Sequence, residues 1–282
     1  METARVVIVT DSTAYLPRTV QAEHGIRVVP LQVVIGGEAY EEGVDATSAT
    51  VAEALRRWTP VSTSRPGPHA FLAAYEQAAD EGYEGVVSVH LSAEMSGTHQ
   101  SAVLAAQDAP LPVRVVDSRS LGMGLGFAVV SAAEAAAGGA GVDEVAAAAE
   151  KRAAGSAAVF YVDTLEYLRR GGRIGAGAAF LGSALSVKPL LHLVDGRIEP
   201  LEKVRTAGKA IARLEELAVA HAGDAEVDAA VHHLANPDRA DALAERLRGR
   251  LPGLRHLHVR EVGAVVGAHV GPGMLAVVVA PR

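Results

Sequence analysis

The sequence contains no cysteine. Disulfide bonds, a thiolate nucleophile and cysteine metal ligands are therefore excluded. Aromatic residues make up only 4% of the 282 residues, so any apolar ligand pocket must be lined mainly by aliphatic side chains. A formal net charge of -7 gives no electrostatic bias toward nucleic acid. We expect a globular protein that does not bind nucleic acid.

Long apolar runs and common catalytic motifs are also missing. No uninterrupted apolar stretch has membrane length, and the first strand-like segment is interrupted at Asp11, too early for a signal peptide. We therefore expect a cytoplasmic protein. The sequence has no Gly-x-Ser-x-Gly, no phosphate loop ending in Gly-Lys-Ser/Thr and no His-Glu-x-x-His. These absences disfavour the most familiar hydrolases and nucleotide-binding enzymes.

Three short apolar segments in the first half are each followed by small polar residues and a helix-like stretch. They cover residues 5–10, 86–91 and 113–116. Such alternation favours a parallel sheet with helices on both faces. Residues 26–35, followed by Gly36-Gly37, predict an extended excursion with a turn. Residues 45–58 predict a helix capped near Asp45 or Thr47.

The second half predicts a mixed or antiparallel sheet with helices on a face. Expected strands cover residues 159–162, 227–234, 254–262 and 275–279, and expected helices cover 207–222 and 238–250. Asp195-Gly196 predicts a two-residue hairpin turn. Asp163 and Glu166 predict a capped helix start, and Gly171-Gly172 its end.

Gly155-Ser156 is a candidate domain boundary. We therefore expect an α/β protein of two domains, an N-terminal parallel-sheet, Rossmann-like domain over residues 1–155 and a C-terminal α/β domain with a mixed or antiparallel sheet over residues 156–282.

Hydroxyl-bearing residues follow the expected strands of the first half or precede a helix-like stretch. Those after strands are Ser12 and Thr13, Ser92, Ser96 and Thr98, and Ser118, whereas Thr63 and Ser64 come before the helix-like stretch that starts near Pro68. Open α/β sheets bind ligands at the carboxyl ends of their strands, and free amides at a helix start favour a small anion such as a carboxylate or phosphate. Ser, Thr and Asp are also the preferred helix caps, so each residue taken singly has a purely structural alternative.

Several of these stretches resemble the motifs of the DegV family of bacterial fatty-acid-binding proteins. The matching segments are Val9-Thr10-Asp11-Ser12-Thr13, Thr63-Ser64-Arg65-Pro66-Gly67-Pro68, Leu91-Ser92 with Ser96-Gly97-Thr98, Val116-Asp117-Ser118, Leu165-Glu166-Tyr167-Leu168 with Gly171-Gly172-Arg173-Ile174, Val187-Lys188-Pro189, Asp195-Gly196, Lys203-Val204-Arg205-Thr206 and His269-Val270-Gly271-Pro272-Gly273. The second segment departs from the family pattern, with Arg65 for Gln and Gly67 for Ser.

The resemblance implies a role for several residues. Thr63 and Ser96 would hold the carboxylate of a long-chain fatty acid, with Ser64, Gly97, Thr98 and His269 beside it. Arg173, Arg205 and His269 would serve engagement with a partner kinase. His269 lies in a Gly- and Pro-rich stretch that predicts a tight loop. The acyl tail would lie between the two domains, along small and aliphatic residues such as those at 180–185.

Two functions remain open at this point. The first, implied by the resemblance, is a carrier without catalytic residues, metal or cofactor, which presents its fatty acid for phosphorylation by an ATP-dependent fatty-acid kinase and makes transient contact with a membrane. The second is a stand-alone hydrolase or acyl or phosphoryl transferase using Ser96 or Ser12 with Asp11, Asp117 or His269. The histidines at 232, 233, 256 and 258 lack an accompanying carboxylate pattern, so we expect surface or packing roles for them rather than metal binding.

Overall fold

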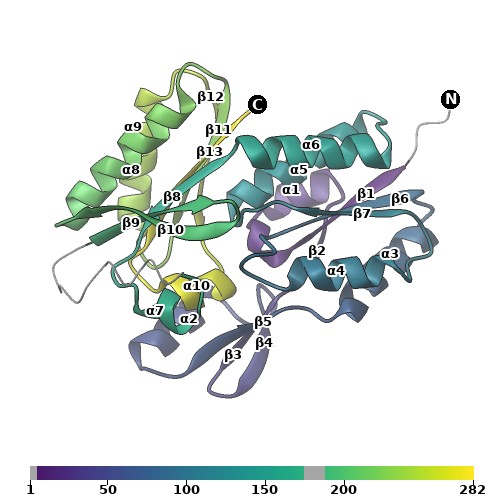
Figure 1. The fold of residues 1–282 in the computed structure, drawn as a ribbon, viewed down its shortest axis with the longest axis horizontal. Coiled ribbons are helices and arrows are strands. Elements are labelled where there is room, and N and C mark those ends of the chain that lie inside the picture. Colours follow the sequence, from purple (N-terminus) through teal and green to yellow (C-terminus); the bar gives the residue numbers. More distant parts are fainter. Residues whose placement is uncertain (1–4, 175–187) are drawn as a thin grey trace. The chain divides into compact units, whose positions relative to one another are not determined.

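The computed structural model describes residues 5–174 and 188–282. By packing, the chain separates into two compact units, Met1–Gln32 with Ser64–Gly155 and Val33–Thr63 with Ser156–Arg282 (Figure 1). The sequence-based division at residue 155 assigns residues 33–63 to the first domain, whereas in the structure they pack within the second unit.

The first unit is built on a parallel four-stranded sheet of order β2-β1-β6-β7. Its strands are β1 (Val6–Asp11), β2 (Arg27–Val29), β6 (Gly85–His90) and β7 (Val113–Asp117). Its helices are η1 (Ser12–Ala14), α1 (Arg18–Glu23), α3 (Pro68–Asp80), α4 (Thr98–Ala106), α5 (Met123–Ala137) and α6 (Val142–Gly155). Every residue of β1 and β6 is buried, as expected for central strands covered on both faces. Helices α3 and α4 cover one face and α5 and α6 the other (Figure 1).

The second unit contains a mixed six-stranded sheet of order β10-β9-β8-β13-β11-β12. Its strands are β8 (Ala157–Tyr161), β9 (Lys188–Val194), β10 (Arg197–Val204), β11 (Val227–His233), β12 (Leu254–Glu261) and β13 (Leu275–Pro281). Only the β11–β12 pair is parallel. Helices α8 (Ala207–Ala222) and α9 (Pro237–Arg250) bury a mainly aliphatic core against this sheet. The expected α/β class, with one parallel and one mixed sheet, is confirmed.

A smaller group of elements completes the second unit. It comprises a three-stranded sheet of order β4-β3-β5, with β3 (Gln32–Ile35), β4 (Glu38–Glu41) and β5 (Val61–Ser64), and the helices α2 (Ser48–Arg56), α7 (Glu166–Arg170) and α10 (Ala264–Val270). Helix α10 packs against both α2 and α7. Val33, Val51 and Ala264 share one small hydrophobic core, which explains why residues 33–63 belong to this unit.

Local turn and cap chemistry accounts for several boundaries. Asp195 and Gly196 have φ of 49° and 80° and join antiparallel strands β9 and β10, so the predicted hairpin is confirmed. Helix α2 is capped by Thr47, one of the two expected caps.

Two local expectations were wrong. Helix α7 is not capped by Asp163, because the amide of Glu166 donates to Thr164 Oγ1 at 3.2 Å and Asp163 pairs with Lys188 at 2.6 Å. The stretch before Gly271 is helix α10 rather than a tight loop, so His269 lies on a helix. The expected tail lining at residues 180–185 lies outside the described residues.

Candidate functional site

Thr63 and His269 come together in the second unit although 206 residues separate them. Thr63 lies on β5 and His269 near the end of α10, and Thr63 Oγ1 is 2.9 Å from His269 Nε2. Both residues are half-buried. The sequence expectation that these two residues share one site is consistent with this contact, and the ligand they would hold stays a prediction.

The imidazole of His269 is neutral near pH 7. Burial, with the positive charge of Arg173 as a smaller cause, lowers the pKa of His269 to about 4. Its Nδ1 atom is buried without a hydrogen-bond partner among the described residues. Arg173 itself donates from Nη1 to the carbonyl oxygen of Gly171 at 2.5 Å. Among the described residues, the His269 ring is therefore held by its hydrogen bond between Nε2 and Thr63 Oγ1.

Three glycines make room for three side chains where α7 meets α10. A Cβ at Gly171 would overlap the His269 ring, one at Gly271 would overlap the Tyr167 ring, and one at Gly273 would overlap the Asp163 carboxylate. Each segment contributes both kinds of residue: residues 163–171 supply one glycine and two side chains, and residues 269–273 supply two glycines and one side chain. We call these six residues the α7–α10 interlock. It fixes the position of His269 by shape.

Ser96, Gly97 and Thr98 form the start of helix α4 in the first unit. Ser96 Oγ is 2.9 Å from Thr98 Oγ1 and also accepts from the Thr98 amide at 3.3 Å. Two hydrogen bonds hold the preceding loop, residues 92–96. The amide of Ala93 donates to Asp117 Oδ1, and the amide of Ser96 donates to the carbonyl of Ser92. Ser96 thus sits at a helix N-terminus, where free amides favour an anion.

The remaining candidate residues lie at the surface or on other elements. Ser64 is exposed, and its hydroxyl donates to the carbonyl of Arg65 at 3.4 Å. Arg205 is exposed between β10 and α8. Their expected roles stay predictions.

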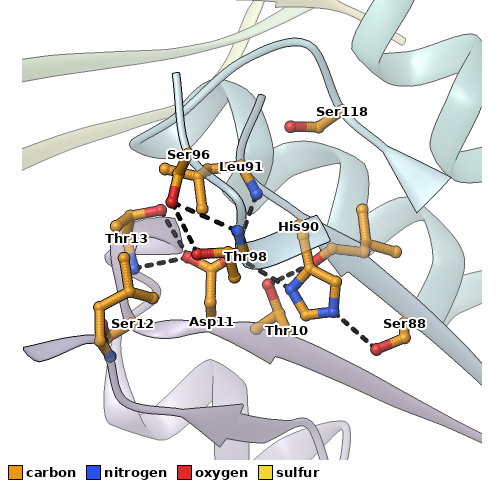
Figure 2. Close-up of polar contacts among 12 residues, drawn as sticks. Thr10, Asp11, Ser12, Thr13, Ser88, His90, Leu91, Ser96, Thr98 and Ser118 are labelled. Carbon is orange, nitrogen blue, oxygen red and sulfur yellow. Dashed lines mark hydrogen bonds and ion pairs between the residues drawn. The ribbon is translucent and has the colours of Figure 1, made fainter. Parts of the chain in front are cut away.

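A buried polar network, which the sequence analysis did not identify, lies at the carboxyl ends of β1 and β6 (Figure 2). Tyr75 donates to Ser88 Oγ at 2.8 Å, Ser88 Oγ lies 2.7 Å from His90 Nε2, and His90 Nδ1 lies 3.1 Å from Asp11 Oδ2. All four residues have 0% exposure. If Tyr75 and Ser88 each donate to the next residue in this order, His90 accepts at Nε2 and donates from Nδ1 to Asp11, so every group has a partner.

The order Asp, His, Ser in this network resembles a hydrolytic triad, but its geometry does not serve one. Ser88 is fully buried and already accepts from Tyr75, so its oxygen is out of reach of a substrate. Asp11 also accepts from the amides of Thr13 and Leu91 at 3.0 Å each, which ties together the loops after β1 and β6. We interpret the network as a structural clamp. In the sequence, the signals for this network are Asp11 at the end of an apolar segment and the polar pair Ser88 and His90 within another apolar segment.

The four histidines of the second sheet correct one expectation. His256 Nδ1 lies 2.8 Å from Asp228 Oδ1, and His233 Nδ1 lies 3.9 Å from Glu261, so carboxylates do accompany two of them. Within residues 5–174 and 188–282 no group of three or more His, Cys, Asp or Glu residues could hold a metal ion. In the same ranges, none of the helices is long and apolar enough to cross a membrane.

Comparisons with known proteins cover nearly the whole chain. The DegV family profile, described as "Uncharacterised protein, DegV family", matches residues 5–282. A DegV domain-containing protein of Streptomyces coelicolor is 63% identical over 277 residues, which are 98% of this chain and 99% of the relative.

Two solved structures share the fold. One, a DegV family protein from Thermus thermophilus described as binding fatty acid, has a TM-score of 0.92 and 36% identity and covers 99% of this chain and 100% of its own. The other, DegV of Bacillus subtilis, described as a fatty-acid-binding protein, has a TM-score of 0.90 and 34% identity with the same coverage. The chain belongs to the DegV family.

Proposed function

We propose that this protein binds a long-chain fatty acid and presents its carboxylate to a partner kinase for phosphorylation. The observation that carries the proposal is the full-length likeness to the Thermus thermophilus and Bacillus subtilis proteins, both described as binding fatty acid. The expected headgroup residues support it, since Thr63 is paired with His269 and Ser96 lies at the start of α4.

The chemistry of these residues suits a carrier. Hydroxyls at Thr63 and Ser96 can donate to a carboxylate, and such charge-assisted hydrogen bonds are strong. A neutral His269 adds no charge of its own. The carboxylate oxygen then stays nucleophilic enough to attack the γ-phosphoryl group of ATP held by the kinase, which yields acyl phosphate and ADP. Arg173 and Arg205 are our candidates for contact with that partner.

The alternative of a stand-alone serine enzyme receives no support from the described geometry. Asp11 is committed to the buried clamp, and Ser12 Oγ accepts from the amide of Leu31 at 3.0 Å. The Oγ atom of Ser96 forms hydrogen bonds with the hydroxyl and the amide of Thr98. Among the described residues, no histidine forms a hydrogen bond with it. We therefore favour the carrier.

Mass spectrometry of the purified protein tests the proposal. We expect native spectra to show one bound lipid, and an organic extract to identify a long-chain fatty acid. A protein that is empty and takes up no added palmitate would overturn the proposal. Hydrolysis of an acyl ester by the purified chain alone would instead favour the enzyme.

The Thr63→Val variant tests the headgroup assignment. Removing the hydroxyl should weaken palmitate binding by about 1 to 3 kcal/mol, because a desolvated carboxylate loses one donor. Titration of variant and wild type measures this loss. Thr50→Val, which changes an exposed threonine on α2, is the matched control and should bind as the wild type does. Equal binding by Thr63→Val would contradict the assignment.

A further inference from the structure

Arg65 reaches the start of helix α4 from the segment that follows β5. A Cβ at Gly97 would overlap Nη1 of Arg65 and lie 2.9 Å from its Cδ, so the guanidinium group packs directly on the Gly97 backbone. Gly97 separates the two candidate headgroup residues Ser96 and Thr98. The cation is thus placed beside the Ser96 hydroxyl and the free amides of the first turn of α4.

Arg65 is available to bind an anion there. Among the residues that the structure describes, no carboxylate pairs with Arg65, whereas other arginines are engaged, such as Arg213 with Glu202 at 2.7 Å and Arg246 with Glu215 at 2.7 Å. A guanidinium group offers a planar pair of N–H donors that matches a carboxylate.

The carboxylate of Asp11 lies near the site where the anion would bind, and the charge of Arg65 can offset its repulsion of that anion. Asp11 is a fully buried residue at the carboxyl end of β1, and Figure 2 shows it at the same edge as Ser96 and Thr98. Its carboxylate accepts hydrogen bonds from Thr13, His90 and Leu91, and no arginine or lysine pairs with it in the described part of the chain. An anionic ligand bound at Ser96 would therefore be repelled by Asp11, and the positive charge of Arg65 beside Ser96 offsets that repulsion.

We propose that Arg65 is a further headgroup-binding residue, which makes this site select a charged fatty-acid carboxylate over a neutral lipid of the same chain length. The inference rests on the proposed function and deepens it. In the motif that this segment resembles, the position of Arg65 holds Gln, which can donate a hydrogen bond but carries no charge. The selectivity is thus a property of this chain rather than of that motif.

Loading from phosphatidylcholine vesicles tests the inference, with palmitate and hexadecanol as paired probes of equal chain length. Extraction and mass spectrometry quantify what each variant takes up. We expect Arg65→Gln to weaken palmitate binding about tenfold and to leave hexadecanol within about twofold, because only the acid carries the charge. Added salt should weaken palmitate binding in the wild type more than in Arg65→Gln.

Two further variants test whether the effect depends on where the Arg65 charge lies or only on the net charge of the protein. Arg5→Gln removes the same charge before the amino end of β1, at the opposite edge of the sheet, and should bind palmitate as the wild type does. Gly97→Ala keeps every charge but displaces the guanidinium group, whose flexible end can move without disturbing the fold. This variant should also lose palmitate affinity and keep hexadecanol affinity.

The outcomes distinguish the inference from the function. A wild type that loads palmitate while Arg65→Gln loads it equally well overturns the inference and leaves the carrier intact. Equal losses of palmitate and hexadecanol in Arg65→Gln also overturn it, since they indicate a packing role. A wild type that loads neither probe overturns the proposed function itself.

Discussion

The Asp11 carboxylate is buried away from water and accepts hydrogen bonds from donors of two chain segments that are distant in sequence. The amide and hydroxyl of Thr13, the amide of Leu91 and the His90 ring all approach its two oxygens, the hydroxyl at 2.6 Å. Two of these donors follow β1 and one follows β6, so a single side chain fixes both strand ends. Position 11 is therefore sensitive to the loss of charge and also to the loss of an acceptor.

The Asp11→Asn variant should be strongly destabilised. The new NH₂ group would face N–H donors, so one buried donor loses its acceptor, and the charge-assisted bonds are lost as well. We expect a decrease in the free energy of unfolding of about 3 kcal/mol. Urea unfolding measures it. Asp80→Asn, at an exposed position at the end of α3, is the matched control and should change stability by less than about 0.5 kcal/mol. Equal midpoints for the two variants would contradict the clamp.

The residues of this clamp show where sequence reasoning reaches its limit. Asp11 is identifiable because it ends an apolar strand next to Ser12 and Thr13, and its motif resembles a known one. Its partners His90 and Leu91 lie 79 and 80 residues away. Only the parallel pairing of β1 with β6 brings them together, and that register does not follow from local pattern.

Helices α7 and α10 illustrate the same limit at the scale of elements. The Asp195-Gly196 hairpin was predictable because its turn requires two residues with positive φ, a local property. Helix α10 was not, since every residue of it except His269 is buried, which leaves no amphipathic period to detect. Its glycines looked like loop residues, whereas Gly267 packs beside Leu234 and Gly271 beside Tyr167.

The α7–α10 interlock predicts a specific effect of the Gly171→Ala variant. Gly171 has φ of -73°, so its backbone tolerates alanine. The new methyl group would overlap the His269 ring and lie 3.2 Å from the carbonyl oxygen of Tyr167, so the ring is the main obstacle. We expect a loss of about 1 to 3 kcal/mol in the free energy of unfolding and displacement of the ring from Thr63. Urea unfolding and ¹⁵N spectra of the histidine rings measure the two effects.

The control for this variant is a glycine whose added Cβ meets no other atom. Gly249 lies inside α9 with nothing within 4 Å of an added Cβ. Gly249→Ala should therefore stabilise the protein by about 0.5 to 1 kcal/mol through helix propensity. Identical stability changes for the two alanine variants would show that Gly171 does not act by making room for His269.

At the scale of the whole molecule, the fold class could be predicted from the sequence, but the way in which distant segments pack together could not. Buried β-branched strands alternating with helices predict a parallel sheet, and the mixed second sheet follows from the hairpin and the later strands. The membership of residues 33–63 in the second unit depends on the hydrophobic core that Val33 and Val51 share with Ala264, more than 200 positions along the chain. Long-range packing of this kind leaves no trace in local composition.

The stability of the molecule should fall as the pH decreases from about 6.5 to about 4. Burial lowers the pKa of both His232 and His269 from 6.5 to about 4. In this interval the unfolded chain binds protons at these two rings and the folded chain does not, so the free energy of unfolding rises with pH. A shift of this size corresponds to about 3 kcal/mol per ring. At His232 the hydrogen bond to the backbone carbonyl of Arg260 favours the protonated ring, whereas the charges of Arg260, His233 and His258 disfavour it. The charge of Arg173 disfavours the protonated ring of His269.

Urea unfolding at a series of pH values, followed by circular dichroism, measures this slope. Replacing both histidines with glutamine removes two of the titrating groups, so the double variant should show a flatter dependence than the wild type between about pH 4 and about pH 6.5, whatever its absolute stability. The comparison of slopes matters because either substitution can disturb packing without affecting proton binding. A wild type whose stability stays constant or increases on acidification through this interval would contradict the lowered pKa values of these two rings.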